Sequence, residues 1–340
     1  MSRIRAWAAP RAGADLAPFE YDPGPLGADE VEIAVESCGI CHSDLSMLDN
    51  AWRRSAYPLV PGHEVVGRVV ARGAAVPAAA RALGQRVGVG WNASSCTHCA
   101  QCVAGDAHLC ADGGETIVGR HGGFAERVRC QWAWATPLPE GVDAASAGPL
   151  FCAGVTVFSP IVEFGVKPTD RVAVVGIGGL GHLALGFLRA WGCEVTAFTS
   201  SASKHAEALA LGAHRAVDSR DAGALKALAG AFDFVLVTVN VPLDWTALLR
   251  TLAPRGRLHF VGAVLEPLAL PAFGLIGGQK QVSGSPMGRP ATVAAMLDFC
   301  ARHAIAPRVE RFPMARVNAA LAHLRAGKPR YRIVLDADFA

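Results

Sequence analysis

Residues 171–192 constrain the fold of this chain more than any other stretch. They read RVAVVGIGGLGHLALGFLRAWG: a short apolar run, a glycine-rich turn, and then apolar residues at helical spacing. Gly176, Gly178 and Gly181 have the GxGxxG spacing. Between a strand and a helix, these glycines permit a tight turn, close approach of a pyrophosphate to the backbone, and close packing of helix on strand. The stretch therefore predicts a strand–turn–helix unit that binds a dinucleotide.

The spacing alone is weak support, because the chain holds 37 glycines and chance matches are common. A glycine-rich turn that binds nothing is the alternative. The position of the motif directly after a buried strand and at the start of a helix favours a cofactor site, because the helix N-terminus offers free N–H groups to phosphates. The expected cofactor contacts in the turn are Gly176, Gly178, Gly179, Leu180 and Gly181.

The chain after this unit continues to alternate between strand and helix patterns. Strands are predicted at 193–200, 232–240 and 257–263, and helices at 203–213 and 242–256. Such alternation is typical of a parallel, doubly wound α/β sheet.

The first half of the chain has a different pattern of apolar runs and turns. Short β-branched runs at 31–37, 64–71 and 124–130 are separated by Gly- and Pro-rich turn signals, which predicts a β-rich domain. A helix is predicted at 292–305, and the run at 330–336 is expected to be a strand that returns to this first domain.

The end of the second predicted strand indicates which dinucleotide is bound. An NAD site usually has an Asp or Glu here for the ribose 2′-hydroxyl, and no acid occurs from Val195 to Ala206. Ser200, Ser201 and Lys204 are present instead, and hydroxyls with a cation suit the 2′-phosphate of NADP(H). The alternative is that a serine only caps the next helix and Lys204 faces solvent.

Four cysteines lie close together in SSCTHCAQCVAGDAHLC, with the spacing C-x2-C-x2-C-x7-C. Four thiolates on a compact loop are typical of a closed, tetrahedral structural zinc site. An iron–sulfur cluster is the other metal group that such a set suits. The expected ligands are Cys96, Cys99, Cys102 and Cys110.

A second metal site is expected from residues near the start of the chain. Cys41 and His63 are good zinc ligands, and a catalytic zinc needs three protein ligands with one open position. Cys152 is the candidate third ligand, although a buried core thiol is the alternative at that position. Glu64 is a reserve ligand or a nearby charge, and Asp44 is placed to fix the tautomer of His63.

Composition excludes several classes of function. The 340 residues suffice for two domains, the net charge is only +3, and the basic residues are scattered, so a nucleic-acid partner is not expected. No apolar run approaches the roughly 20 residues that cross a bilayer, and no secretory signal is evident, so we expect a cytoplasmic protein without membrane contact. Ten cysteines in such a chain favour metal or catalytic use, and a Cys38–Cys41 redox pair remains open.

These motifs stand in an order that resembles the zinc-containing medium-chain alcohol dehydrogenases, and within them the cinnamyl-alcohol-dehydrogenase-like branch. The resemblance covers nearly the whole chain. It implies a GroES-like catalytic domain over 1–153 and 305–340 with both zinc sites, a Rossmann domain over 154–304, two zinc ions per subunit, and a homodimer or homotetramer. The motifs that carry it are CGICHSD, YPLVPGHEVVGRVV, the four-cysteine loop, LFCAGVTVFSP, GIGGLGHLA and RYRIVLD.

The resemblance also implies an activity and roles for single residues. It implies hydride transfer between NADP(H) and a small primary alcohol or aldehyde, aromatic or medium aliphatic, with Cys152 as the third zinc ligand. Ser43 would shuttle the substrate proton and His42 would face the pyrophosphate. Ser46 stands where this branch often has a histidine that ends the proton relay, so the outer part of that relay is not predicted.

Other functions remain as alternatives. An NAD-dependent polyol dehydrogenase would be expected to show the missing acid after the second strand, and a zinc-free quinone or enoyl reductase would not need the three proposed ligands. A nucleic-acid-binding zinc module does not explain the glycine motif, and a non-catalytic NADPH-binding sensor has the same ligands without turnover. The candidate residues for a substrate pocket are Trp52, Tyr57, Trp91 and Met287.

Overall fold

The structure is a computed structural model that describes residues 3–339. The chain divides into two compact units, and each is described by itself: one comprises the chain up to Val155 and from Met287 onward, and the other runs from Thr156 to Pro286. The stretch 287–304, grouped above with the nucleotide domain, thus belongs to the first unit, where Ala301 lies against Gly141. No helix in the described residues is long and apolar enough to span a membrane.

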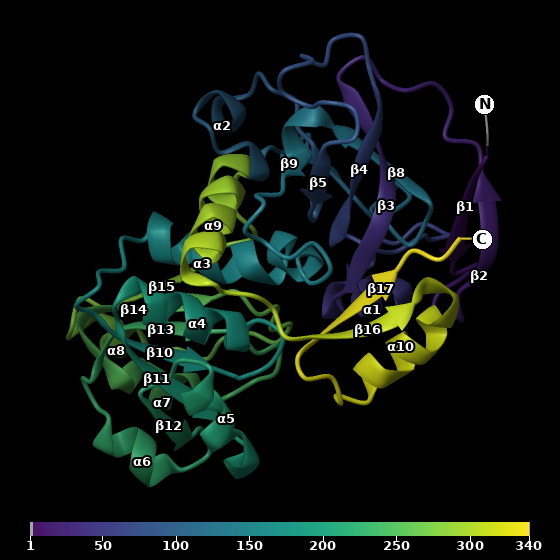
Figure 1. The fold of residues 1–340 in the computed structure, drawn as a ribbon. Coiled ribbons are helices and arrows are strands. Elements are labelled where there is room, and N and C mark those ends of the chain that lie inside the picture. The colour runs from purple at the N-terminus through teal and green to yellow at the C-terminus, as the bar shows by residue number, and fades with distance from the viewer. Residues whose placement is uncertain (1–2, 340) are drawn as a thin grey trace. The chain divides into compact units, whose positions relative to one another are not determined.

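The first unit is built on a largely antiparallel sheet with strand order β16-β17-β3-β4-β5-β9, and β8 also pairs with β3. Near the C-terminus β17 pairs with β3, Ile333 opposite Ile40, so the predicted return of this strand to the first domain is confirmed (Figure 1). The strands are β3 (Glu30–Ile40), β4 (Val65–Arg72), β5 (Arg86–Val89), β8 (Arg127–Gln131), β9 (Thr136–Pro137), β16 (Val309–Pro313) and β17 (Arg332–Asp336).

Alternation of side chains explains the register of this sheet. In the second half of β4, Val69 is buried whereas its neighbours Arg68 and Val70 are exposed, so one face there covers the core and the other faces water. The remaining elements of this unit are β1 (Ile4–Ala8), β2 (Ala17–Tyr21), β6 (Asn92–Ser94), β7 (Gly114–Glu115), α1 (His42–Leu48), α2 (Ala100–Val103), α9 (Pro290–His303) and α10 (Val317–Arg325). Helix α3 (Ala153–Glu163) continues the chain from the first unit into the second.

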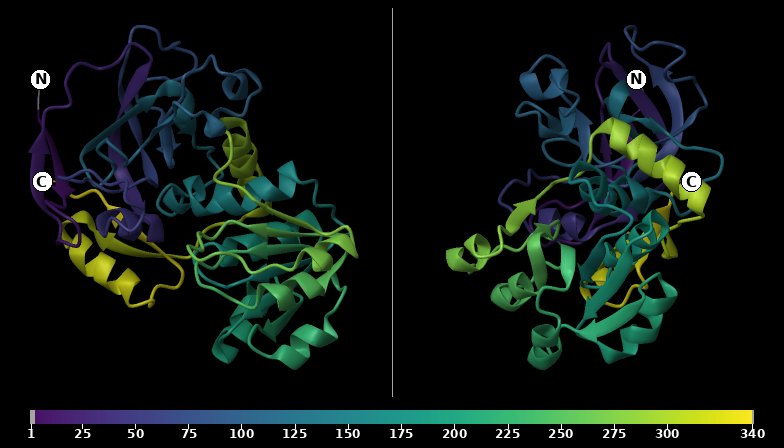
Figure 2. Two further views of the ribbon diagram at one scale, coloured as in Figure 1. Left: turned by 180° about the vertical axis from the view of Figure 1, so that it is seen from behind. Right: turned by 90° about the vertical axis from the view of Figure 1, so that its left-hand side faces the viewer.

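The second unit is a parallel sheet with strand order β12-β11-β10-β13-β14-β15. Taken in chain order this is 3-2-1-4-5-6, the order of a doubly wound dinucleotide-binding fold. Figure 2 shows α4 and α5 on one face of the sheet and α6, α7 and α8 on the other. The predicted fold class, a GroES-like β-rich domain with a Rossmann domain, is confirmed.

The elements of the second unit follow the sequence pattern closely. The strands are β10 (Arg171–Val175), β11 (Glu194–Thr199), β12 (Arg215–Asp218), β13 (Phe232–Val237), β14 (Leu252–Phe260) and β15 (Gln281–Gly284). The helices are α4 (Gly181–Trp191), α5 (His205–Ala210), α6 (Ala222–Ala227), α7 (Trp245–Thr251) and α8 (Ala272–Ile276). The helix expected at 242–256 is shorter than predicted, because Pro254 cannot continue a helix and Arg255 has a positive φ of 65°.

Candidate metal centres and nucleotide site

The four residues proposed for the catalytic zinc come together in the first unit. Cys41 caps the N-terminus of α1, His63 and Glu64 directly precede β4, and Cys152 follows the short helical turn Gly148–Phe151. One donor atom from each residue lies within 4.8 Å of the others. Three of the residues are buried and Cys152 is nearly so, which makes this a cluster sheltered from bulk water.

The distances within this cluster fit a tetrahedral zinc ion. With Zn–S near 2.3 Å and Zn–N near 2.0–2.1 Å, tetrahedral geometry separates two sulfur ligands by about 3.8 Å, and a sulfur and a nitrogen ligand by about 3.6 Å. Here the Sγ atoms of Cys41 and Cys152 are 3.9 Å apart, and His63 Nε2 lies 3.3 Å from Cys152 Sγ. The three atoms are therefore spaced for one ion, with room in its coordination for a fourth ligand.

Asp44 organises the cluster through both carboxylate oxygens. Its Oδ1 accepts from the Gly62 amide and from His63 Nδ1, each at 3.0 Å, and its Oδ2 accepts from the Cys41 amide at 2.8 Å. The second of these bonds leaves His63 Nε2 as the free ligand atom, and the third closes the capping box of α1. A single buried side chain thus positions two proposed ligands.

Glu64 is held by an arginine that sequence reasoning missed. Arg332 of β17 donates to Glu64 Oε1, and both side chains are buried. Within residues 3–339, Glu64 Oε2 has no hydrogen-bond partner, which leaves one carboxylate oxygen available to a metal. A Cβ atom on Gly39 would lie 2.0 Å from this oxygen, so glycine is required there. The signal in the sequence was Arg332 itself, a charged residue directly before the apolar run Ile333–Leu335.

Electrostatics in the cluster favour anionic sulfur. The Cys152 thiol donates to Cys41, and this bond, together with the charge of Arg332, places the pKa of Cys41 well below its usual value despite burial. Sharing that proton raises the pKa of Cys152. Burial disfavours a charged His63 ring, but Asp44 and Cys41 outweigh burial and raise its pKa. Zinc binding would displace these protons, since the metal takes thiolates and a neutral imidazole.

One of the four candidate pocket residues lies beside this cluster, and a second packs against the first. Trp91 meets the His63 ring edge-on at 5.0 Å, and Trp52 meets Trp91 at 5.7 Å. Tyr57 instead contacts the C-terminal end of α1, where its hydroxyl donates to the Leu48 carbonyl at 2.9 Å. Met287 approaches Gly90, where its Cε would lie 2.9 Å from an added Cβ.

The residues proposed for proton transfer lie on α1, directly after Cys41. Ser43 is half-buried with its Oγ 3.7 Å from Cys41 Sγ, so its hydroxyl lies at the edge of the cluster. His42 is exposed, and Ser46 is half-buried one turn further along the helix.

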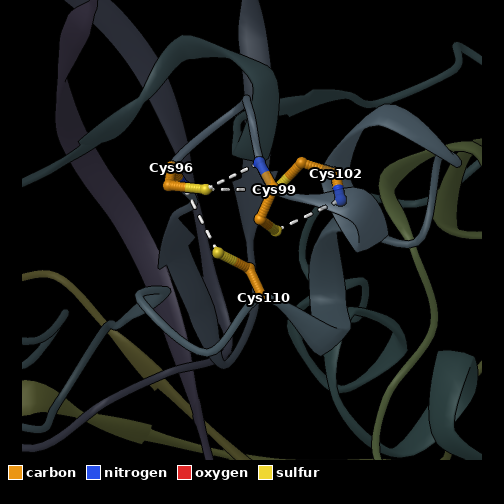
Figure 3. A group of neighbouring side chains, drawn as sticks. All are labelled: Cys96, Cys99, Cys102 and Cys110. Carbon is orange, nitrogen blue, oxygen red and sulfur yellow. Dashed lines mark hydrogen bonds between the residues drawn. The ribbon is translucent and has the colours of Figure 1, made fainter.

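The four cysteines proposed for the structural zinc also come together, and Figure 3 shows their side chains gathered within one loop. The Sγ atoms of Cys96 and Cys102 are 3.9 Å apart, and one sulfur from each of the four residues lies within 4.8 Å of the others. This spacing favours a single tetrahedral ion over an iron–sulfur cluster, whose ligands bind different irons. The four residues are Cys96, Cys99, Cys102 and Cys110.

The backbone of this loop is shaped to present the sulfur atoms. Backbone amides point at sulfur, from Cys99 to Cys96 at 3.3 Å and from Cys96 to Cys110 at 3.4 Å. The His98 and Cys99 amides lower the pKa of Cys96 to about 6, so this side chain is readily a thiolate. Thr97 has φ = 67°, a conformation unusual for a β-branched residue and typical of a turn held in place by its surroundings. The loop therefore fits a structural zinc ion.

The glycine motif in the second unit has the shape that a pyrophosphate needs. A Cβ on Gly181 would lie 1.9 Å from the Gly176 carbonyl oxygen, so the helix can approach the strand only with glycine there. Gly176 has φ = 91°, which favours glycine. A Cβ on Gly178 would meet no atom within 4 Å, so the backbone there faces open space. Helix α4 then begins at Gly181 without a side-chain cap, which suits an anion at its N-terminus.

The polar residues proposed for the adenosine end of the cofactor follow β11. Lys204 Nζ donates to the Ile177 carbonyl at 3.0 Å, so this cation lies over the glycine turn. Ser201 Oγ and Ser203 Oγ are 2.8 Å apart, and Ser200 is exposed beside them. The alternative that Lys204 only faces solvent does not hold, because its ammonium contacts the glycine turn at the Ile177 carbonyl.

Comparison with known proteins places the chain in a family. Residues 27–140 match the alcohol dehydrogenase GroES-like domain, and residues 179–302 match the zinc-binding dehydrogenase domain. The chain is 57% identical to the aldehyde reductase AdhA of Synechocystis sp. over 98% of both proteins. It belongs to the zinc-containing medium-chain alcohol dehydrogenases.

Further relatives place this dehydrogenase in the cinnamyl-alcohol-dehydrogenase-like branch. It is 41% identical to the probable cinnamyl alcohol dehydrogenase 8A of Oryza sativa subsp. japonica, over 97% of this chain and 94% of that protein. A cinnamyl alcohol dehydrogenase of Sorghum bicolor superposes with a TM-score of 0.94 at 38% identity, covering 98% of each chain. The Helicobacter pylori enzyme complexed with NADP(H) gives 0.90 at 27% identity, also over 98% of each. The predicted family is confirmed.

Proposed function

We propose that this dehydrogenase is a zinc-dependent alcohol dehydrogenase, or aldehyde reductase, that transfers hydride between NADP(H) and a primary alcohol or aldehyde. The observation that carries the proposal is the spacing of Cys41, His63 and Cys152, which suits one zinc ion with a fourth position left for substrate. Zinc bound there would act as a Lewis acid on the substrate oxygen, and the nicotinamide would supply the hydride chemistry.

The protein's own groups would position the substrate and move its proton. Ser43 is the proposed proton carrier, because its hydroxyl both donates and accepts and lies beside Cys41. Asp44 would keep His63 in the ligating tautomer and compensate part of the positive charge. His42, exposed next to Ser43, is proposed to meet the cofactor pyrophosphate, and Ser46 offers a hydroxyl where relatives of this branch often have a histidine.

The preference for NADP(H) is proposed from the polar residues after β11. Ser200, Ser201 and Lys204 provide hydroxyls and a cation, and no carboxylate occurs from Val195 to Ala206 to repel a 2′-phosphate. The solved relative from Helicobacter pylori is described as complexed with NADP(H). An NAD-dependent polyol dehydrogenase is disfavoured by the same residues.

The substrate is proposed to be an aromatic or medium aliphatic aldehyde or its alcohol. Trp91 places an apolar ring beside His63, and Trp52 packs against Trp91. Relatives are named as cinnamyl alcohol dehydrogenases and as an 8-hydroxygeraniol dehydrogenase. From the family resemblance we further propose a cytoplasmic homodimer or homotetramer, which sedimentation of the purified protein and fractionation of cells would test.

The test is steady-state reduction of benzaldehyde and cinnamaldehyde with NADPH and NADH, together with zinc analysis of the purified enzyme. We expect two zinc ions per chain and a higher kcat/KM with NADPH. Cys152→Ser should lose one zinc ion and at least about a hundredfold in activity, the range seen when a single electrostatic contributor is removed. Cys193→Ser is the matched control, because that buried thiol donates to the Lys167 carbonyl and belongs to the second unit, whereas all the proposed zinc ligands belong to the first. Full activity of Cys152→Ser would refute the ligand assignment.

A further inference from the structure

Strands β11 and β12 bring together two short segments that are distant in sequence. The strands are parallel neighbours, with Thr199 opposite Asp218 at their carboxyl ends. The Ser219 amide donates to the Thr199 carbonyl at 3.1 Å, which joins the loops that follow the strands. In open α/β sheets ligands bind outside the carboxyl ends of the strands. Residues just after β12 therefore share an edge of the sheet with Ser200 and the proposed adenosine end of the cofactor site.

Arg220 extends from β12's loop to that edge. Its guanidinium donates from Nη2 to the Ser200 carbonyl, and its side chain is 70% exposed. The backbone amide of Arg220 donates to Asp218 Oδ1 at 2.9 Å, which fixes the turn that directs the side chain toward β11. The guanidinium is thus anchored at one nitrogen, and its exposed surface leaves further donors for a ligand.

The cluster carries two cations near two hydroxyl-bearing residues. Lys204 lies on the side of the glycine turn, and Arg220 on the side of β12. The facing anion is Asp218, whose Oδ1 is 3.6 Å from Arg220 Nε, longer than a charge-assisted hydrogen bond. The bond to the Ser200 carbonyl holds the guanidinium at this edge, where a phosphate would meet a planar group with several donors.

We propose that Arg220 is a specificity-determining residue that binds the 2′-phosphate of NADP(H) together with Lys204. This inference rests on the proposed use of NADP(H). A guanidinium near the ribose is a known chemical solution for the 2′-phosphate, and here it comes from the strand beyond the one that sequence reasoning inspects. Because the site is exposed, water and salt weaken the interaction, so Arg220 contributes about tenfold to affinity.

Asp218 is proposed to compete with the phosphate for Arg220. An asparagine at this position still offers Oδ1 to the Arg220 amide, so Asp218→Asn keeps the turn and removes only the charge. We expect Asp218→Asn to bind NADPH several-fold more tightly and NADH with unchanged affinity.

The experiment measures binding rather than turnover. Dissociation constants of NADPH, NADH, adenosine 2′-monophosphate and adenosine 5′-monophosphate are determined by calorimetry for the wild type, Arg220→Gln and Arg171→Gln. Arg171 is the matched control, because it is an exposed arginine paired with Asp233 at 3.0 Å at the amino ends of the same sheet's strands. Arg220→Gln is expected to bind NADPH and adenosine 2′-monophosphate about tenfold more weakly, and the other two ligands as before.

The outcomes separate this inference from the proposed function. If wild type prefers NADPH and Arg220→Gln keeps the whole preference, the role of Arg220 is refuted while the NADP(H) assignment stands. If wild type binds NADPH no more tightly than NADH, the cofactor assignment itself is refuted and the inference with it. Equal losses for NADPH and NADH would indicate a disturbed site and would also overturn the inference.

Discussion

Acidification is expected to destabilise the second unit through His259. This ring is fully buried in β14, its Nδ1 lies 2.9 Å from Ser283 Oγ, and its Nε2 lies 2.9 Å from Ser285 Oγ. Phe164 and Phe234 flank it at 4.8 Å and 5.8 Å between ring centroids. The two serine hydroxyls can satisfy a neutral ring, whereas a second proton would sit among apolar rings without a carboxylate partner in this set.

The magnitude follows from the shifted pKa. Burial, with a smaller effect from the Arg257 charge, lowers the pKa of His259 to about 4, against an ordinary value near 6.5. The folded pKa is the lower one, so the unfolded chain binds more protons between these values, and stability falls as the pH drops from 6.5 to 4. The loss is about 2 kcal/mol at pH 5, reaches about 3 kcal/mol near pH 4, and then stays constant.

The assay is hydrogen exchange of peptides that cover β14 and β15, corrected for the intrinsic pH dependence of exchange. His259→Gln removes the titrating ring and keeps an amide that can bond one serine. Between pH 7 and pH 5, the free energy of opening of the wild type should therefore fall by about 2 kcal/mol more than that of His259→Gln. The exposed His303 provides the control His303→Gln, which should follow the wild type. Parallel pH profiles of wild type and His259→Gln would refute this reasoning.

Three further predictions concern the Glu64–Arg332 pair and the glycine turn. Arg332→Leu would leave the Glu64 carboxylate buried without its partner, so this variant should lower the free energy of unfolding by about 3–5 kcal/mol. The Arg332→Leu/Glu64→Gln double variant should recover stability. Additive losses in a double-mutant denaturation cycle would contradict the pairing. Gly178→Ala should leave the melting temperature nearly unchanged and weaken NADPH binding, because its Cβ would enter open space that the cofactor needs. Gly181→Ala should lower the melting temperature by several degrees, because its Cβ would clash with the Gly176 carbonyl. If calorimetry showed that Gly178→Ala lowers the melting temperature more than Gly181→Ala, the roles assigned to these two glycines would be contradicted.

Several features of the chain were predictable because their determinants are local. The four-cysteine loop spans residues 96–110, so its spacing alone limits how the sulfur atoms can be arranged. The strand, glycine turn and helix from Arg171 to Trp191 follow from the spacing of apolar residues and from the conformations open to glycine. The helix expected at 242–256 was too long, because Leu252 and Ala253 extend the apolar pattern although Pro254, which cannot continue a helix, follows them.

The metal cluster near β3 was only partly predictable. The short segment around Cys41 and the later His63 indicated a metal. Cys152 is 111 residues from Cys41, and it was a candidate ligand beside the alternative of a core thiol until the family resemblance implied the third ligand. Single cysteines in apolar surroundings are more often core residues, so no local pattern separates a ligand from a core thiol.

The sequence by itself determined the fold class, the glycine turn and the grouping of the four cysteines in one loop, since each depends on neighbours along the chain. Only the tertiary structure decided which distant side chains meet. Arg332 reaches Glu64 across 268 residues because β17 pairs with β3, and Arg220 reaches Ser200 because β12 lies beside β11 in register. Which strands pair depends on how the whole sheet covers the core. The side chains that paired strands bring together are therefore fixed only when the complete sheet is assembled.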